Sequence, residues 1–156
     1  MAAIEARLAE LGIQLPDVVP PVAAYTPAVI DGNHVYTSGQ LPMVSGALPA
    51  TGKVGDGHGL VPADDAKEYA RTCALNALAA AKSVIGSLDR VTRIVKVVGF
   101  VASDPSFTGQ PGVINGASEL LGEIFGDAGV HARSAVGVSV LPLDSPVEVE
   151  LILSFE

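Results

Sequence analysis

The chain opens with one amphipathic segment and then alternates between strand and helix patterns. A short helix, ended by Gly12, is predicted over residues 3–11 because three apolar residues have helical spacing: Ile4, Leu8 and Leu11. A proline-rich connector follows over residues 14–23. Two β-rich runs then flank the dipeptide Asp31-Gly32, a turn sequence that predicts a hairpin.

Two longer helices are predicted in the rest of the chain. One begins after Pro62 and is ended by Gly86, and the other covers residues 111–125. Apolar residues share one side of the first of these helices: Ala66, Tyr69, Ala70, Cys73, Ala74, Ala77, Leu78, Ala81, Val84 and Ile85. The second has a comparable face: Val113, Ile114, Ala117, Leu120, Leu121, Ile124 and Phe125. So much alanine on the first face predicts a close approach to a sheet.

The remaining patterns predict strands and one long loop. Residues 91–102 form a strand, residues 131–156 form a second hairpin that closes the chain, and residues 42–63 form a loop rich in Gly and Pro. After the N-terminal helix, the element order is ββαβαββ. This order predicts an α+β fold in which two helices cover one face of a four- or five-stranded sheet.

Alternation along the strand at 91–102 places apolar side chains on both faces of that sheet. One face is expected to hold Val91, Val95, Val97 and Val101, and the other Ile94, Val98 and Phe100. The two helices can cover only one face. We therefore expect the other face to be buried in a homo-oligomer whose sheets pack around a shared axis.

Composition narrows the function classes. The 156 residues suit a single domain, and 49% hydrophobic against 17% charged residues excludes a disordered chain. The net charge of −8 argues against nucleic-acid binding, because phosphates favour clustered Lys and Arg. The single cysteine, Cys73, excludes an internal disulfide and suits a reducing compartment. Since the sequence has no run near the ~18 residues of a membrane span and no signal-peptide pattern, we expect a cytoplasmic protein with no membrane partner.

Three charged residues stand out in the apolar C-terminal segment: Arg133, Glu148 and Glu150. The valine-rich faces of both strands are expected against the helices, which places Arg133 and Glu148 together on the opposite face, toward a neighbouring subunit. There Arg133 can bind a carboxylate through two parallel hydrogen bonds, and Glu148 can hold or deprotonate a water. An ordinary inter-strand or inter-subunit ion pair explains the same two residues. Glu150 shares this face and is assigned no role beyond an ion pair.

Four further residues are weaker candidates for ligand contact. Ser38 and Gly39 end the second strand, where the glycine lets a ligand approach the backbone or simply ends the strand. Tyr25 offers a phenol to a ligand or packs half-buried on its strand, and Asn115 points at a ligand or lies at the helix surface. Cys73 belongs to the core. The histidines are too dispersed to predict a metal site: His34, His58 and His131.

Two segments of the chain resemble the YjgF family, also called the Rid family of enamine/imine deaminases. They are YTSGQLP at 36–42 and HARSAVGVSVLPLDSPVEVEL at 131–151. The resemblance spans about residues 20–155, and the order ββαβαββ matches the family's chorismate-mutase-like fold. It implies a homotrimer with three clefts at subunit interfaces.

The resemblance also implies a reaction and a set of site residues. The reaction is the cofactor-free hydrolysis of a 2-imino acid, or its enamine tautomer, to a 2-keto acid and ammonia. Arg133 matches the residue that binds the substrate carboxylate, and Glu148 matches the residue that positions water. The other positions that match the family's cleft are Tyr25, Ser38, Gly39 and Asn115.

The chain also departs from the family. Ala135 stands where cysteine is frequent, and both the N-terminal helix and connector (1–20) and the loop 42–63 exceed the compact family pattern. These differences indicate a longer branch of the family with a reshaped cleft. The alternative functions are a non-catalytic trimer that binds small carboxylates and a ribonuclease-like protein, and the acidic net charge disfavours the latter.

Overall fold

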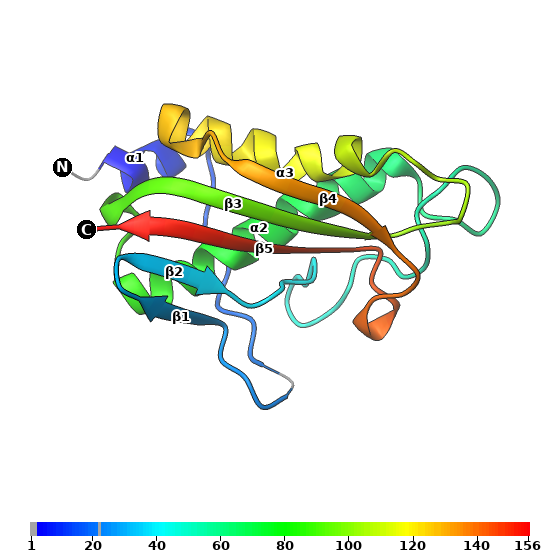
Figure 1. Cartoon of the computed structure of the whole chain (residues 1–156), viewed down its shortest axis with the longest axis horizontal. Coiled ribbons are helices and arrows are strands. Elements are labelled where there is room, and N and C mark those ends of the chain that lie inside the picture. The colour runs from blue at the N-terminus through cyan, green and yellow to red at the C-terminus, as the bar shows by residue number, and fades with distance from the viewer. Residues whose placement is uncertain (1–2, 22) are drawn as a thin grey trace.

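The helices and strands follow one another in the order that the sequence predicts (Figure 1). The computed structural model describes residues 3–21 and 23–156. Its helices are α1 (Ala3–Glu10), α2 (Ala63–Ile85) and α3 (Gln110–Phe125). Its strands are β1 (Ala28–Asp31), β2 (His34–Thr37), β3 (Val91–Ala102), β4 (Ala132–Val138) and β5 (Val147–Phe155). Within these ranges, no helix has the length and apolar character needed to cross a membrane.

The five strands form one sheet in the order β1-β2-β5-β3-β4. Neighbouring strands are antiparallel except β3 and β4, which run parallel with α3 as their crossover. The predicted C-terminal hairpin is therefore wrong, because β4 and β5 do not pair and instead lie on opposite sides of β3 (Figure 1). Alternation marks a run as a strand, but it does not say with which strand it pairs.

The core lies between the sheet and the two long helices, which cover one face (Figure 1). Every predicted apolar residue of α3 is buried, as are most of those predicted on α2. Val84 is an exception because it lies 37% exposed near the end of α2. Conversely, Asn76 is buried among the alanines of α2, which apolar periodicity did not predict.

The predicted alternation of β3 is wrong in its first half. Ile94 is fully buried toward the helices, whereas its neighbour Val95 is only half-buried. Two irregularities in the pairing of β3 with β5 explain why Ile94, and not Val95, faces the helices, since the register shifts on either side of Ile94. Each such bulge adds a residue and reverses the faces of the side chains that follow it.

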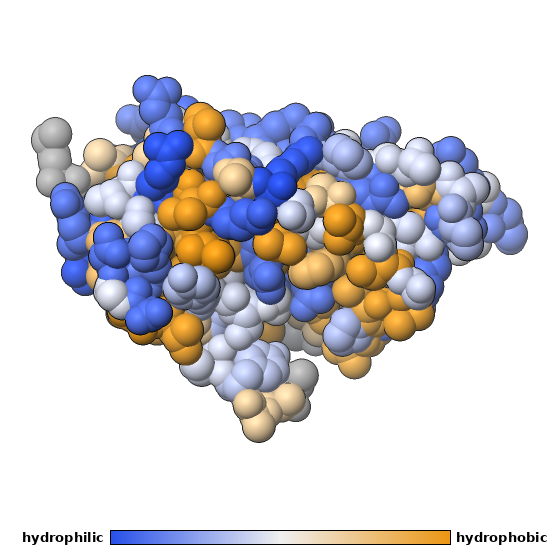
Figure 2. Space-filling model, viewed as in Figure 1, coloured by the Kyte–Doolittle hydropathy of each residue, from blue (hydrophilic) through white to orange (hydrophobic). Residues whose placement is uncertain are grey.

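The face of the sheet away from α2 and α3 is partly apolar, as predicted. It includes Val98 and Phe100, half-buried on β3, and the more exposed Tyr36 and Val136 at 41% and 44%. Figure 2 shows this face, where hydrophobic patches lie over the sheet between hydrophilic ones. We call it the open face.

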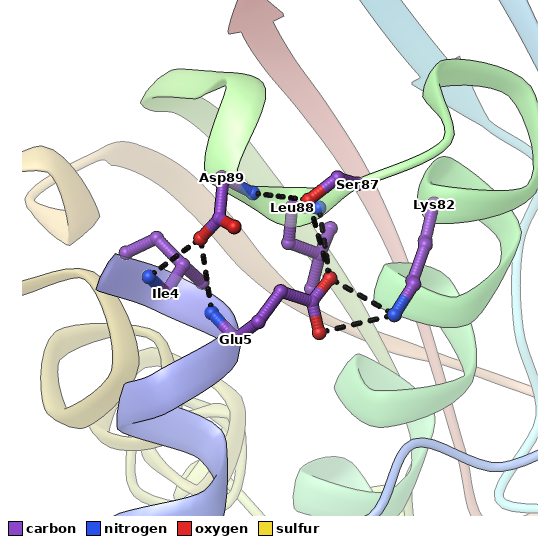
Figure 3. Close-up of polar contacts among 6 residues, drawn as sticks. All are labelled: Ile4, Glu5, Lys82, Ser87, Leu88 and Asp89. Atoms are coloured by element: carbon purple, nitrogen blue, oxygen red, sulfur yellow. Dashed lines mark hydrogen bonds and ion pairs between the residues drawn. The ribbon is translucent and has the colours of Figure 1, made fainter. Parts of the chain in front are cut away.

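Helix α1 docks on the body of the protein through two carboxylates (Figure 3). Asp89 accepts hydrogen bonds at one oxygen from the backbone N–H groups of Ile4 (2.8 Å) and Glu5 (3.0 Å), at the helix N-terminus. The Glu5 carboxylate in turn forms an ion pair with Lys82 (2.9 Å) and accepts from the N–H of Leu88 (3.2 Å). These bonds explain why so short a helix is stable, because eight residues would be marginal alone.

Candidate functional site

Four of the predicted site residues line a single pocket on the chain. The pocket has a volume of about 520 Å³ and lies between the end of β2, the segment before β1 and the turn before β5. Its lining residues are Val19, Pro20, Ala23, Tyr25, Ser38, Gly39, Gln40, Leu41, Met43, Pro142, Leu143 and Glu148. The sequence therefore identified Tyr25, Ser38, Gly39 and Glu148 as neighbours although they come from distant segments.

Glu148 lies on β5 directly beside Gly39. A Cβ atom added to Gly39 would overlap the Glu148 carboxylate, so the glycine makes room for that side chain. Backbone hydrogen bonds of 2.8 and 3.0 Å between Gln40 and Val149 hold the two segments together. Gly39 also lines the pocket, and the approach of a ligand to its backbone stays a prediction.

The hydroxyl and amide of Ser38 fix the segment that carries Tyr25. The Ser38 Oγ donates to the carbonyl of Thr26 at 2.6 Å, and the Ser38 N–H donates to the carbonyl of Pro27 at 2.8 Å. Tyr25 itself is 46% exposed, so its ring is more accessible than that of a half-buried strand residue. The serine therefore positions the pocket wall through its own hydrogen bonds.

Two carboxylates on β5 face away from the helices with no ion-pair partner within residues 3–21 and 23–156. Burial raises the pKa of Glu148, and the charge of Glu150 raises it further. Burial also raises the pKa of Glu150. Beneath them the thiol of Cys73 is fully buried, and burial and the charge of Glu148 raise its pKa. A half-buried carboxylate without a cation suits proton transfer more than structural pairing.

Arg133 does not lie in this pocket. Arg133, on β4, pairs with Val97 of β3, and Val97 pairs in turn with Leu151 of β5. Val97 and Leu151 are both buried under the helices. Arg133 is therefore on the helix-covered face, and the prediction that it shares a face with Glu148 is wrong. Glu148 pairs with Phe100 on the open face. With β3 between them, β4 and β5 are about 10 Å apart.

The reason for this error is the packing of α3 against the small residues of β4. Ala135 pairs with Gly99, where an added Cβ would overlap Ile114 of α3. An added Cβ at Gly137 would meet the Gln110 side chain at 2.8 Å. The small side chains near Arg133 thus accommodate the helix, and the valine face of β4 is left on the open side.

The guanidinium of Arg133 is held by α3. Its Nη1 donates to Asn115 Oδ1 at 2.9 Å and to Ser118 Oγ at 3.2 Å, and its Nη2 donates to the carbonyl of Pro111 at 3.2 Å. Among the described residues, the Nε–H has no acceptor, and Nη2 donates only one of its two N–H groups. The guanidinium therefore keeps two donors with which it can bind a carboxylate. Asn115, predicted to face a ligand or solvent, contacts Arg133 instead.

Ser118 and His131 extend this network, and the sequence analysis had assigned neither to the site. His131 Nδ1 lies 2.6 Å from the carbonyl of Gly129, so this nitrogen carries the proton of that hydrogen bond. The Ser118 hydroxyl lies 2.9 Å from Nε2 of His131 and accepts from Arg133. Ser118 stands three residues after Asn115, on the same side of a helix, and this spacing is the signal that could have identified it.

Asn76 is a further residue that the sequence analysis missed. Its Nδ2 donates to the carbonyls of Leu41 (3.0 Å) and Met43 (3.1 Å), both of which line the pocket. The residue is 1% exposed, so a buried side chain of α2 fixes the backbone of the pocket wall. An asparagine inside an alanine-rich stripe was the available signal. No group of three potential metal ligands occurs in the described parts of the chain.

Comparison with known proteins connects this arrangement to a family. Residues 5–155 match a family described as "YjgF/chorismate mutase-like, putative endoribonuclease". Protein TCP17 of Trypanosoma cruzi is 41% identical over 153 residues, which cover 96% of this chain and 92% of that protein.

Two solved structures show how closely the fold is shared. A crystal structure of a protein of unknown function from Agrobacterium tumefaciens has 44% identity and a TM-score of 0.89, covering 99% of this chain and 93% of that one. RidA from the Antarctic bacterium Psychrobacter has 27% identity and a TM-score of 0.60, covering 89% and 94%. The family match covers residues 5–155, which is nearly the whole chain. The chain belongs to the YjgF/chorismate mutase-like family.

Proposed function

We propose that this protein hydrolyses 2-imino acids, or their enamine tautomers, to 2-keto acids and ammonia. Family membership supports the proposal, and so does the pocket around Glu148. The observation that carries most weight is the half-buried carboxylate of Glu148, which has no ion-pair partner among the described residues. Such a group can accept a proton from water without competition from a cation.

The proposed reaction requires only an oriented acid–base group and a bound water. Glu148 takes a proton from the water as its oxygen adds to the carbon of the protonated imine, which gives a tetrahedral aminoalcohol. Glu148 then passes this proton to the nitrogen. The C–N bond breaks and ammonia leaves as the C=O bond forms, and the hydroxyl proton returns to Glu148. Holding water and imine in contact supplies much of the rate acceleration.

The substrate carboxylate would bind to Arg133 of a neighbouring copy. Within one chain Arg133 and Glu148 lie on opposite faces, so one small imino acid cannot reach both. A trimer, the assembly that the family resemblance implies, would bury the apolar open face and bring the two residues together. We assign Asn115 and Ser118 the task of holding the Arg133 guanidinium in place, with its remaining donors available to the carboxylate.

The acidic charge of the chain disfavours the endoribonuclease activity that the family description names. A net charge of −8, and two carboxylates on the open face, would repel a phosphate backbone.

A deamination assay tests the proposal. Wild type should release ammonia and 2-oxobutanoate from freshly generated 2-iminobutyrate faster than the uncatalysed hydrolysis in buffer. Arg133→Ala should lower kcat/KM by about 10- to 100-fold, the effect of losing a charged hydrogen-bond pair. Arg71→Ala, which removes a guanidinium that pairs with Glu123 on the helices, is the matched control and should keep wild-type activity.

The two failures have different meanings. Equal rates for wild type and Arg133→Ala would remove the assigned role of Arg133. No rate in either, with keto acids still bound, would leave the non-catalytic binder of small carboxylates.

A further inference from the structure

We propose that the preferred substrates are 2-imino acids with a bulky apolar side chain, which the pocket beside Glu148 holds against Leu143. The inference rests on the proposed deaminase function and narrows its substrate class.

The first argument is the chemistry of the pocket lining. Glu148 is the only charged side chain among the described lining residues. The apolar lining residues outnumber the polar ones: Val19, Pro20, Ala23, Leu41, Met43, Pro142 and Leu143. A volume of about 520 Å³ is many times the roughly 30 Å³ share of one water, so a three- or four-carbon imino acid would leave most of it to solvent. A branched or aromatic side chain would remove more of this apolar surface from water.

The second argument is the backbone of Leu143. Its φ of 58° and ψ of 20° lie in the left-handed region, which side chains with a Cβ rarely adopt. Its side chain is nevertheless 61% exposed, so packing within the chain does not explain why leucine stands there. A strained residue that presents an apolar side chain to a pocket points to ligand contact.

The turn that contains Leu143 is held by hydrogen bonds from the loop 42–63. Lys53 Nζ lies 2.8 Å from Asp144 Oδ1, and the N–H of Gly52 donates to the carbonyl of Asp144 at 2.9 Å. Asp144 also has a positive φ of 58°, so both strained residues lie in the turn that this loop holds. Leu143 is therefore fixed at the pocket and can discriminate between side chains.

A second apolar part of the lining follows a segment that is anchored to the body of the protein. Helix α1 is anchored through Glu5 and Asp89 (Figure 3), and the following residues Ile13 and Leu15 pack against the core. The chain then reaches the pocket at Val19 and Pro20. Val19 and Pro20 thus add apolar surface to the compartment beside Leu143 that would hold a side chain.

Calorimetric titration with 2-keto acids tests the proposal without requiring turnover. The probes are 4-methyl-2-oxopentanoate, with a branched apolar side chain, and pyruvate, with a methyl group. Wild type should bind the branched acid at least about tenfold more tightly, the discrimination that apolar pockets achieve per added methylene group.

Leu143→Asn is the diagnostic variant, because asparagine tolerates the left-handed backbone and replaces the apolar wall with an amide of similar size. It should lose most of the preference while its affinity for pyruvate stays within about twofold. Val84→Ala, which trims an exposed apolar residue on α2, is the control and should bind like wild type.

Equal or weaker binding of the branched acid by wild type, or an unchanged preference in Leu143→Asn, would overturn the inference. Imine turnover measured on the same samples separates the two proposals. Tight, Leu143-dependent binding without any deamination would support the pocket's preference for bulky apolar side chains and refute the catalytic function.

Discussion

At the scale of single residues, the proposed catalysis depends on how easily Glu148 ionises. Burial and the nearby charge of Glu150 both raise its pKa, and neither carboxylate has an ion-pair partner among the described residues. Water activation requires the ionised form of Glu148. The rate should therefore rise with pH as Glu148 loses its proton, which gives Glu150 a role that the sequence analysis could not assign.

Glu150→Gln should move the acid limb of the rate profile to lower pH. The variant removes a negative charge that disfavours ionisation of Glu148, so the pKa of Glu148 falls and the base form persists in more acidic solution. The measurement is kcat/KM against pH for wild type and variant. Glu123→Gln, at an exposed position on α3, should leave the profile unchanged. An acid limb that stays in place or moves to higher pH in Glu150→Gln would refute this coupling.

At the scale of elements, the contact between α2 and α3 depends on one glycine. A Cβ added at Gly116 of α3 would overlap the backbone carbonyl of Lys67 on α2, and backbone cannot move aside as a flexible side chain does. Gly122, on the same helix, has nothing within 4 Å of such an atom. The two positions form a natural pair for testing the packing.

Gly116→Ala should destabilise the fold by about 1–3 kcal/mol, the usual cost of forcing an added carbon into a packed contact. Gly122→Ala should instead be neutral or stabilise it by up to about 1 kcal/mol, because alanine is the better helix former. Denaturant unfolding followed by circular dichroism gives both values. A loss of stability in both variants, or in neither, would mean that the helices do not approach closely at Gly116.

The elements themselves were largely predictable from the chain. All seven residues predicted on the apolar side of α3 are buried. This prediction was reliable because a long helix repeats its apolar pattern over several turns. The pairing of β4 and β5 was not predictable in the same way. Both alternate like hairpin strands, yet β4 pairs in parallel with β3 through the α3 crossover, a long-range choice that no local pattern encodes.

The site was predictable only in part, for the same reason. The motif residues Ser38, Gly39 and Glu148 do meet in one pocket. The predicted face of Arg133 was wrong because alternation sorts the residues of a strand into two sets without saying which set meets the helices. The small residues beside Arg133 accommodate α3.

At the scale of the whole molecule, one chain holds two half-sites on opposite faces of its sheet. One is the pocket with Glu148, and the other is the guanidinium of Arg133, which α3 supports. The partly apolar open face, visible in Figure 2, is the surface that further copies would cover in the proposed trimer. The central claim is that catalysis requires both half-sites from different copies.

Mixed oligomers of two inactive variants test that claim most directly. Arg133→Ala and Glu148→Gln carry different affinity tags, are co-expressed, and are purified through both tags, with light scattering to establish the mass of three chains. Each variant alone should be nearly inactive. Every mixed trimer selected through both tags should have about a third of wild-type activity, because one of its three interfaces combines an intact Arg133 with an intact Glu148 from the neighbouring copy. Mixed trimers as inactive as either variant alone would contradict the account.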